Sequence, residues 1–148
     1  MSTDHSPETN KSTVRRLYEF INGNRAEQFA LVVAPRYVDH SNGQQGPSGF
    51  AEAAANLHRA YADLRLEIAD MVAEGDLVAV RWVETGRHVG QFFSLKPTGK
   101  RFESRGMNLY RVRDGKILES WLAIDPVTIR AQREAQQAPA EAGSDWGA

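Results

Sequence analysis

Residues 64–88 of this 148-residue chain, LRLEIADMVAEGDLVAVRWVETGRH, alternate between apolar and polar side chains. This alternation is typical of β-strands, because successive side chains of a strand point to opposite faces. The polar segment Glu74-Gly75-Asp76 interrupts the pattern and has the composition of a tight turn. The stretch therefore predicts two antiparallel strands joined as a hairpin.

The second strand of this hairpin separates its side chains into two sets. The more apolar set comprises Val78, Val80, Trp82, Glu84 and His88. We expect this set to face a layer of helices, so that Glu84 and His88 point toward the interior, where a charged group must be hydrated, paired or functional. Gly86 leaves an alternative, because a bulge at this glycine would turn His88 outward.

Helical periodicity precedes the hairpin. Residues 6–22 predict a first helix with Ser6 as its N-cap. Apolar residues at helical spacing then predict a short second helix closed by Pro35, and a third helix that ends near Ala62. The segment RYVDHS, between the second and third helices, predicts a brief strand.

Later turns at KPTGK and RDGK separate further strands, which gives about five strands after three helices. This order predicts an α+β domain in which three N-terminal helices cover one face of a curved antiparallel sheet. We expect the domain to span residues 6–134, with disordered tails at 1–5 and 135–148. Asp39 and Asp125 are predicted to cap a turn and a short helix, respectively.

The turn at residues 114–115 allows two registers for the last hairpin. A two-residue turn puts Asn108 beside Trp121, whereas a three-residue turn with a bulge puts Asn108 beside Ser120. We favour the second register because it separates apolar from charged side chains more cleanly. Its interior face collects Asn108, Tyr110, Val112, Leu118, Ser120, Leu122 and Ile124, and its other face Arg105, Arg111, Arg113, Glu119 and Asp125.

Composition limits the possible classes of function. The net charge of -1 provides no basic surface for nucleic acid or anionic lipid. The chain has no cysteine, which excludes disulfides, thiolate nucleophiles and cysteine-bound zinc. Its N-terminal segment is polar, and no apolar run approaches the ~20 residues of a membrane span. We therefore expect a cytoplasmic protein that binds neither nucleic acid nor membranes.

Four segments carry a resemblance to a known family: YVDHS, YADLRLEIADMVAEGDLVAVRW, GRHVGQFFSLKPTGKRFE and YRVRDGKILESW. In their order and spacing, from about Val14 to Ile129, the chain resembles the SnoaL-like polyketide cyclases. These small enzymes have the cone-shaped fold shared with nuclear transport factor 2 and ketosteroid isomerase. The resemblance implies such a cone, and an enclosed pocket for a small-molecule substrate.

The resemblance also locates the acid/base position of the family. In the related ester cyclases the last strand is similar to EHWDVVD, whose aspartate is the general acid/base of an intramolecular aldol closure. This chain carries Ser120 and Leu122 at the histidine and aspartate positions, and Asn108 where relatives have a pocket histidine. A leucine cannot move a proton. Glu84 could replace the missing aspartate if burial raises its pKa, or it could instead pair with an arginine at the edge of the sheet.

Candidate site residues follow from these positions. The candidates for catalysis are His40, which resembles a histidine at the pocket rim of many relatives, Glu84 and His88. The candidates for substrate binding are His58, Tyr61, Trp82, Phe92, Asn108, Tyr110, Ser120 and Leu122. Each has a structural alternative, since a histidine beside an apolar stripe is commonly a hydrogen-bonded structural residue and aromatic residues at strand spacing commonly belong to the core.

We therefore expect a cofactor-independent enzyme of secondary metabolism that cyclises, isomerises or hydroxylates a polyketide or aromatic intermediate. The alternative is a non-catalytic protein of the same fold that binds a small ligand. No cofactor is expected, and no metal either, because no two histidines have a spacing that presents both on one face. Family members commonly pair through the outer sheet face, and Met107, Leu109 and Trp121 make that face apolar, which predicts a homodimer.

Overall fold

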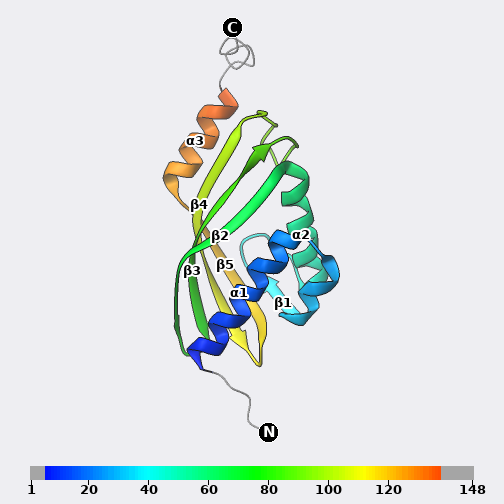
Figure 1. Cartoon of the computed structure of the whole chain (residues 1–148), viewed down its shortest axis with the longest axis vertical. Coiled ribbons are helices and arrows are strands. Elements are labelled where there is room, and N and C mark those ends of the chain that lie inside the picture. Colours follow the sequence, from blue (N-terminus) through cyan, green and yellow to red (C-terminus); the bar gives the residue numbers. More distant parts are fainter. Residues whose placement is uncertain (1–5, 138–148) are drawn as a thin grey trace.

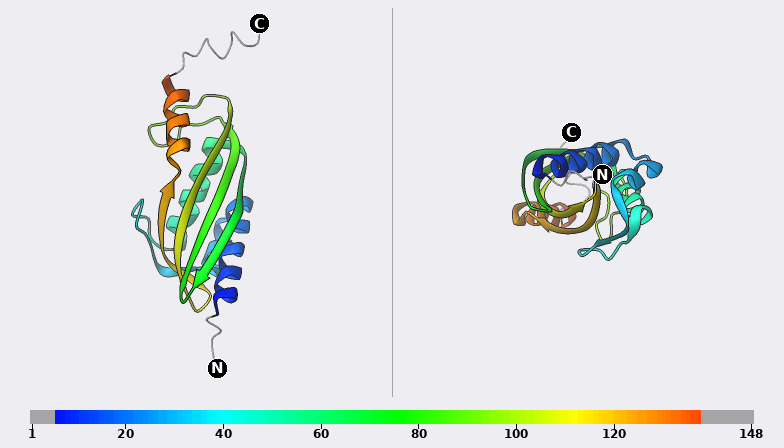
Figure 2. Two further views of the ribbon diagram at one scale, coloured as in Figure 1. Left: turned by 90° about the vertical axis from the view of Figure 1, so that its left-hand side faces the viewer. Right: turned by 90° about the horizontal axis from the view of Figure 1, so that it is seen from below.

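A long five-stranded sheet forms the body of the molecule, and two helices cover one of its faces (Figure 1). The computed structural model describes residues 6–137 of the chain. Its elements are α1 (Pro7–Gly23), the 3-10 helix η1 (Ala26–Leu31), β1 (Val33–Asp39), α2 (Gly46–Ala60), β2 (Tyr61–Glu74), β3 (Leu77–His88), β4 (Arg101–Arg113), β5 (Lys116–Ile124) and α3 (Pro126–Gln137). The predicted α+β class is therefore confirmed. Seen end on, the strands curve around an interior that α1 and α2 help to close (Figure 2).

The strand order is β1-β5-β4-β3-β2. Strands β2 to β5 form an antiparallel meander, as predicted from the turns between them. The prediction of a wholly antiparallel sheet is wrong, because β1 pairs with β5 in parallel. Between β1 and β5 the chain crosses over through α2 and the rest of the sheet, and such a long connection allows parallel pairing. Pro35, expected to close a helix, lies within β1, where an edge strand tolerates its missing N–H.

The helices differ from the prediction in two places. The second helix is a single 3-10 segment, η1, whereas the strand predicted between the second and third helices is present as β1. The third helix, α2, ends at Ala60 rather than near Ala62, because Tyr61 is already extended and begins β2. At the other end of the chain α3 continues to Gln137, so the expected disordered tail does not begin at residue 135. The remaining parts of the predicted tails, residues 1–5 and 138–148, lie outside the described residues.

Helix α1 begins and ends as its sequence dictates. The Ser6 side chain caps it by accepting a hydrogen bond from the backbone N–H of Thr9. At its C-terminal end, the Asn22 side-chain amide donates to the carbonyl of Leu66 (2.9 Å) and accepts from the N–H of Leu66 (2.8 Å). These two hydrogen bonds hold the end of α1 against β2. The predicted apolar stripe is buried: Val14, Leu17, Tyr18 and Ile21.

The inner face of β3 passes through three environments. Val78 and Val80 are fully buried in the hydrophobic core with residues of α1, η1, β1, β4 and β5. Trp82 and Glu84, further along, border a cavity, and His88 borders a second one. All five residues face inward, as their alternation predicts. The packed core therefore fills one end of the curved sheet and leaves the other end for binding.

The last hairpin adopts neither predicted register. Residues 114–115 form a two-residue turn in which both have positive φ, as type I′ turns require. One extra residue, Leu118, then bulges from β5, and beyond it Asn108 pairs with Leu122. Ile117 rather than Leu118 is buried at the start of β5. The predicted register is wrong, but the extra residue in β5 keeps Leu122 on the same face as Asn108. Both residues therefore face the interior, as predicted.

Candidate functional site

A cavity of ≈ 200 Å³ lies between α2 and the inner face of the sheet. Seven of the eight predicted substrate-binding residues line it: Tyr61, Trp82, Phe92, Asn108, Tyr110, Ser120 and Leu122. Glu84 lines the same cavity. The alternation of side chains along the strands brings these residues together. Each one lies on the inward-facing side of its strand or in the loop after β3. A mostly apolar pocket with a few polar groups is typical of small-molecule sites.

Several residues of the cavity wall were not predicted: Tyr18 of α1, Tyr37 of β1, Phe50 and Leu57 of α2, and Phe102 and Ser104 of β4. Tyr18, Phe50 and Leu57 belong to apolar helical stripes, and periodicity alone does not distinguish the wall of a cavity from the core. Ser104 could have been found from its pairing, because it lies directly opposite Glu84.

Glu84 is the buried carboxyl group of the cavity. It lies on β3 between Leu66 of β2 and Ser104 of β4, and only 7% of its surface is exposed. Burial raises the pKa of the Glu84 carboxyl to about 7. Within residues 6–137 no ion pair or hydrogen bond involves this carboxyl, so the alternative of an arginine-paired glutamate is wrong. Near neutral pH it can therefore both accept and donate a proton.

Two phenol groups lie within electrostatic reach of Glu84. Burial, and more weakly the negative charge of Glu84, raises the pKa of Tyr61 well above its usual value. Burial likewise raises the pKa of Tyr18, against the effect of its hydrogen bond with Tyr110. Both phenols therefore stay protonated at any physiological pH and remain hydrogen-bond donors.

Most other polar groups in the cavity satisfy one another. The hydroxyl oxygens of Tyr18 and Tyr110 are 2.9 Å apart, and those of Tyr37 and Ser120 are 2.6 Å apart. The first pair joins α1 to β4, and the second joins the neighbouring strands β1 and β5. The Ser120 hydroxyl, a candidate for orienting a substrate carbonyl, is thus already held by Tyr37.

The amide of Asn108 has a defined orientation. The indole Nε1–H of Trp82 can only donate, so the atom 2.8 Å from it must be the amide oxygen of Asn108. The indole crosses β4 at Gly106, where a Cβ atom would lie 2.5 Å from Cζ2 of Trp82. With its oxygen occupied, Asn108 presents its NH₂ group, which has no hydrogen-bond acceptor within residues 6–137. Asn108 therefore supplies a fixed donor for a carbonyl oxygen of a ligand.

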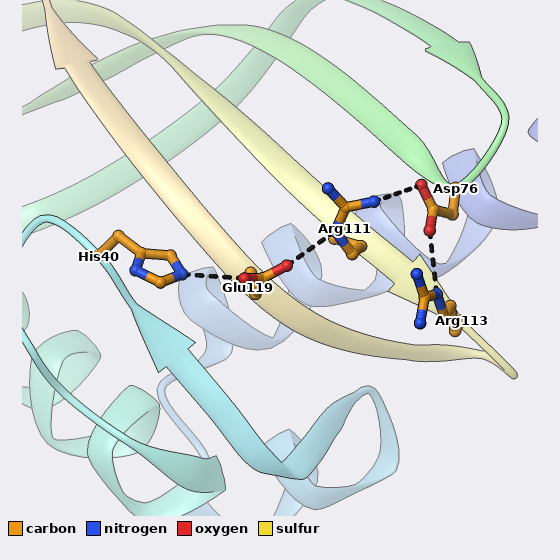
Figure 3. A network of polar contacts seen from close by, with 5 residues as sticks. All are labelled: His40, Asp76, Arg111, Arg113 and Glu119. Atoms are coloured by element: carbon orange, nitrogen blue, oxygen red, sulfur yellow. Dashed lines mark hydrogen bonds and ion pairs between the residues drawn. The ribbon is translucent and has the colours of Figure 1, made fainter.

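His40 lies outside this cavity. Its Nε2 is 3.1 Å from a carboxylate oxygen of Glu119, and its ring stacks on Trp121 with the ring centres 4.9 Å apart. Glu119 and Trp121 face the outer side of β5, where Arg111 continues a network of polar contacts (Figure 3). The rim position implied for His40 by the family resemblance is therefore not the one that its ring occupies.

The other two histidine candidates also lie apart from Glu84. Nε2 of His58 is 2.7 Å from the carbonyl oxygen of Ile21, which agrees with its structural alternative. His88 is inward-facing and only 5% exposed, so the bulge considered at Gly86 is wrong: Gly86 pairs in register with Phe102. His88 borders the second cavity rather than the one that holds Glu84.

Leu122 lies at the mouth of the main cavity. It is 36% exposed, and its N–H donates to the Ser41 hydroxyl (2.9 Å) in the loop after β1. The predicted capping residues in and near this region have the expected contacts: Asp39 accepts from the N–H groups of Ser41 and Asn42, and Asp125 from that of Val127. Across residues 6–137, no cluster of acidic and histidine side chains is arranged to hold a metal ion. No helix in the same range is long and apolar enough to cross a bilayer.

The residue types in the cavity suit proton transfer at a carbon atom beside a carbonyl group. Glu84 provides a carboxyl that titrates near neutrality, and Asn108 a donor for the carbonyl oxygen. Aromatic side chains around them, among them Trp82 and Phe102, offer flat surfaces to a ring system.

The chain is similar to a known family and to several known proteins. The family model described as SnoaL-like polyketide cyclase matches residues 11–133. The chain is 31% identical over 110 residues to the aklanonic acid methyl ester cyclase DnrD of Streptomyces peucetius, covering 70% of this chain and 76% of that protein. The structure of IdmH, a putative polyketide cyclase of Streptomyces antibioticus, is similar with a TM-score of 0.71 and 32% identity, over 84% of this chain and 98% of that one. AclR of Streptomyces galilaeus, a putative hydroxylase, matches with a TM-score of 0.72 and 25% identity, over 96% and 94%.

Proposed function

Because the chain belongs to the SnoaL-like polyketide cyclase family, we propose that it is a cofactor-independent enzyme acting on a polyketide or aromatic intermediate of secondary metabolism. The substrate lies in the cone-shaped enclosure that the family implies, among the aromatic side chains of the main cavity. The observation that carries the proposal is the buried, unpaired carboxyl of Glu84, whose pKa is raised to about 7. The reaction we favour is an intramolecular cyclisation, with isomerisation and ring hydroxylation as the other members of the proposed class.

Glu84 acts as both base and acid in this reaction. Its carboxylate removes a proton from a carbon beside a carbonyl group, and the resulting enolate carbon attacks a second carbonyl of the same molecule. A carbon–carbon bond forms, and the protonated Glu84 returns its proton to the new alkoxide. The product is an isomer of the substrate, so no other reactant is needed. A carboxyl whose pKa lies near the working pH is best suited to both transfers.

Asn108 stabilises the negative charge of the enolate that forms between the two proton transfers. As the proton leaves, charge develops on the carbonyl oxygen, and the NH₂ group of Asn108 donates a hydrogen bond to it. Trp82 makes this donor ready in advance, since its indole holds the amide oxygen and prevents the amide from turning. The preorganised donor stabilises the enolate without reorientation during the reaction.

The proposal is tested with aklanonic acid methyl ester, the compound named for the relative DnrD, as the trial substrate. Products are separated by liquid chromatography, and their molecular masses are measured by mass spectrometry. A cyclised product has the same mass as the substrate, whereas hydroxylation adds the mass of one oxygen atom. We expect Glu84→Gln to lower turnover about 100-fold or more, the usual contribution of a general acid/base. Glu67→Gln, which removes an exposed carboxylate on β2, is the matched control and keeps its activity. Full activity of Glu84→Gln would exclude Glu84 from the mechanism.

A non-catalytic ligand-binding protein is the second candidate. It is favoured by Leu122 and Ser120 at the family's acid/base positions and by the Ser120 hydroxyl being held by Tyr37. The part of the tryptophan fluorescence quenching that Trp82→Phe abolishes measures binding in the main cavity independently of turnover. Saturable binding of the trial substrate, without any product from the wild-type protein, would support this candidate over the enzyme.

We also propose that two copies pair through the outer face of the sheet. Met107 is 49% exposed there, beside Leu109 and Trp121. His40 stacks on the Trp121 ring and so covers part of the apolar surface expected from the sequence. The remaining apolar area around Met107 is the surface we expect to be buried in a homodimer.

A further inference from the structure

A second cavity, of ≈ 130 Å³, lies beyond one wall of the main cavity. Tyr61, Phe102 and Gln132 border both cavities, and the rings of Tyr61 and Phe102 stack with their centres 4.3 Å apart. The second cavity is enclosed by the loop between β3 and β4, the first residues of β4 and the helix α3. It is therefore a separate space rather than an extension of the mouth of the main cavity.

A contact between the loop and α3 joins two sides of the cavity. The Gln136 side chain accepts a hydrogen bond from the backbone N–H of Lys96 (3.0 Å) and donates one to the carbonyl oxygen of Lys96 (2.6 Å). Both the loop and α3 thus keep their positions around the cavity without a ligand. A pocket formed in advance binds a ligand at a lower entropic cost than one that must be assembled.

His88 lines this cavity and carries a buried polar atom without a partner. Only 5% of the residue is exposed, and its Nε2 has no hydrogen-bond partner within residues 6–137. Burial lowers the pKa of His88, partly offset by a hydrogen bond to the backbone of Gly90. The N–H of Gly90 donates to Ala60, so its carbonyl is the group that meets His88 and fixes the ring proton on Nδ1. Nε2 of the neutral ring is then an acceptor, and it requires a donor such as a hydroxyl group.

Two cations border the same cavity. Lys100 and Arg101 line it, both have exposed side chains, and neither forms an ion pair within residues 6–137. Glu103 also lines the cavity, but its carboxylate is held by the guanidinium of Arg105 at 3.0 Å. The cavity rim therefore carries uncompensated positive charge, which favours an anion.

We propose that the second cavity binds a small hydroxy-carboxylate, whose hydroxyl group donates to Nε2 of His88 and whose carboxylate lies against Lys100 and Arg101. The hydroxyl satisfies a buried acceptor that otherwise lacks a partner, and the carboxylate meets the unpaired cations. This inference does not depend on the reaction proposed for the main cavity, and it assigns His88 to ligand binding rather than to proton transfer.

The test titrates the full-length, isotope-labelled chain with L-lactate and follows backbone amide resonances by NMR. We expect saturable shifts at residues 88–90, 98–102 and 132–136. Propionate, which lacks the hydroxyl, and lactamide, which lacks the charge, are the matched ligands. Each should bind at least about threefold more weakly than lactate, since each loses one polar interaction. Arg16→Gln, which removes an exposed cation on α1, should leave lactate binding unchanged.

Two variants localise the binding. Exchange of both exposed cations, Lys100→Gln with Arg101→Gln, should weaken lactate binding about tenfold without altering the fold, and His88→Phe should remove the preference for lactate over propionate. Equal binding of lactate and propionate to the wild-type chain would overturn the role of His88. Shifts confined to other basic surfaces, or no saturable shift at millimolar lactate, would overturn the site and leave a cavity filled by water alone.

Discussion

Glu84 and Glu119 are the same kind of side chain on opposite faces of one sheet, and they have opposite electrostatic environments. Hydrogen bonds from His40 and Arg111 lower the pKa of Glu119 on the outer face (Figure 3). Burial without a partner raises the pKa of Glu84 to about 7 on the inner face. The difference shows that available partners, rather than residue type, determine which carboxylate can transfer protons near neutrality.

The largest expected difference between Glu84 on the inner face and Glu119 on the outer face is in how the free energy of unfolding depends on pH. In the folded state Glu84 takes up its proton near pH 7, and in the unfolded chain near pH 4.5. Between these values the folded state binds more protons, so the free energy of unfolding falls as pH rises, by roughly 3 kcal/mol in total. Urea unfolding measures this from pH 5 to 8. As pH increases, the free energy of unfolding of Glu84→Gln should rise relative to that of the wild-type protein.

Glu119→Gln is the matched control on the outer face. Its lowered pKa stabilises the folded state above the unfolded-state pKa, and this contribution is lost only as pH falls further through the folded-state value. In a His40→Gln background, where Arg111 is the remaining partner, the difference that Glu119→Gln makes should therefore stay constant from pH 5 to 8. A constant difference for Glu84→Gln as well would mean that water reaches the Glu84 carboxyl.

A charge placed on the outer apolar surface should weaken the proposed dimer. Trp121→Glu introduces a carboxylate beside Met107, and we expect its dimer dissociation constant to rise tenfold or more, as burial of an unpaired charge predicts. Sedimentation velocity at micromolar concentration measures the change, and ligand binding in the main cavity should stay unaltered. A wild-type chain that sediments only as a monomer would contradict the dimer.

A carboxylate at the mouth, where the two faces meet, should have a smaller effect. Because Leu122 is 36% exposed, the new side chain of Leu122→Asp remains hydrated, and we expect a stability change below about 1 kcal/mol. Thermal unfolding at pH 5 and pH 8 is the measurement. A larger cost that disappears at the lower pH would show that the side chain turns into the cavity.

The smallest effect belongs to the outer network. Arg111 joins Asp76 and Glu119 at 2.8 Å and 2.7 Å, and 30% of its side chain stays exposed to solvent. Arg111→Gln should lower the melting temperature only slightly, and the difference should shrink in about 1 M salt, which screens exposed charges. A difference that is independent of salt would indicate that the arginine acts through packing.

Sequence reasoning found most of the predicted substrate-binding residues that line the main cavity. Parity along β3 placed Glu84 and His88 inside, and apolar matching placed Asn108 and Leu122 on the cavity side despite the wrong register. The caps at Ser6, Asp39 and Asp125 are short-range contacts and were predicted from the residues beside them. These features depend on a few neighbouring residues, so local patterns contain the information that predicts them.

Features that depend on distant parts of the chain were not predicted. Tyr61 carries the apolar spacing of α2, but it begins β2 because pairing with His88 outweighs helical propensity. No local pattern in β1 indicates that it pairs in parallel with β5, some eighty residues later in the chain. This pairing brings His40 to the outer face of the sheet.

The local alternation of side chains was thus sufficient for the strands, for the inward direction of Glu84 and for the general class of the domain. Packing between elements determined everything that needs two distant partners: the bulge at Leu118, the amide orientation that Trp82 imposes on Asn108, and the wall of Tyr61 and Phe102 that separates His88 from Glu84. The physical reason is range. Alternation is a property of adjacent residues, whereas a pKa, a closed cavity or a hydrogen-bond partner depends on side chains that only the folded chain brings within a few ångströms.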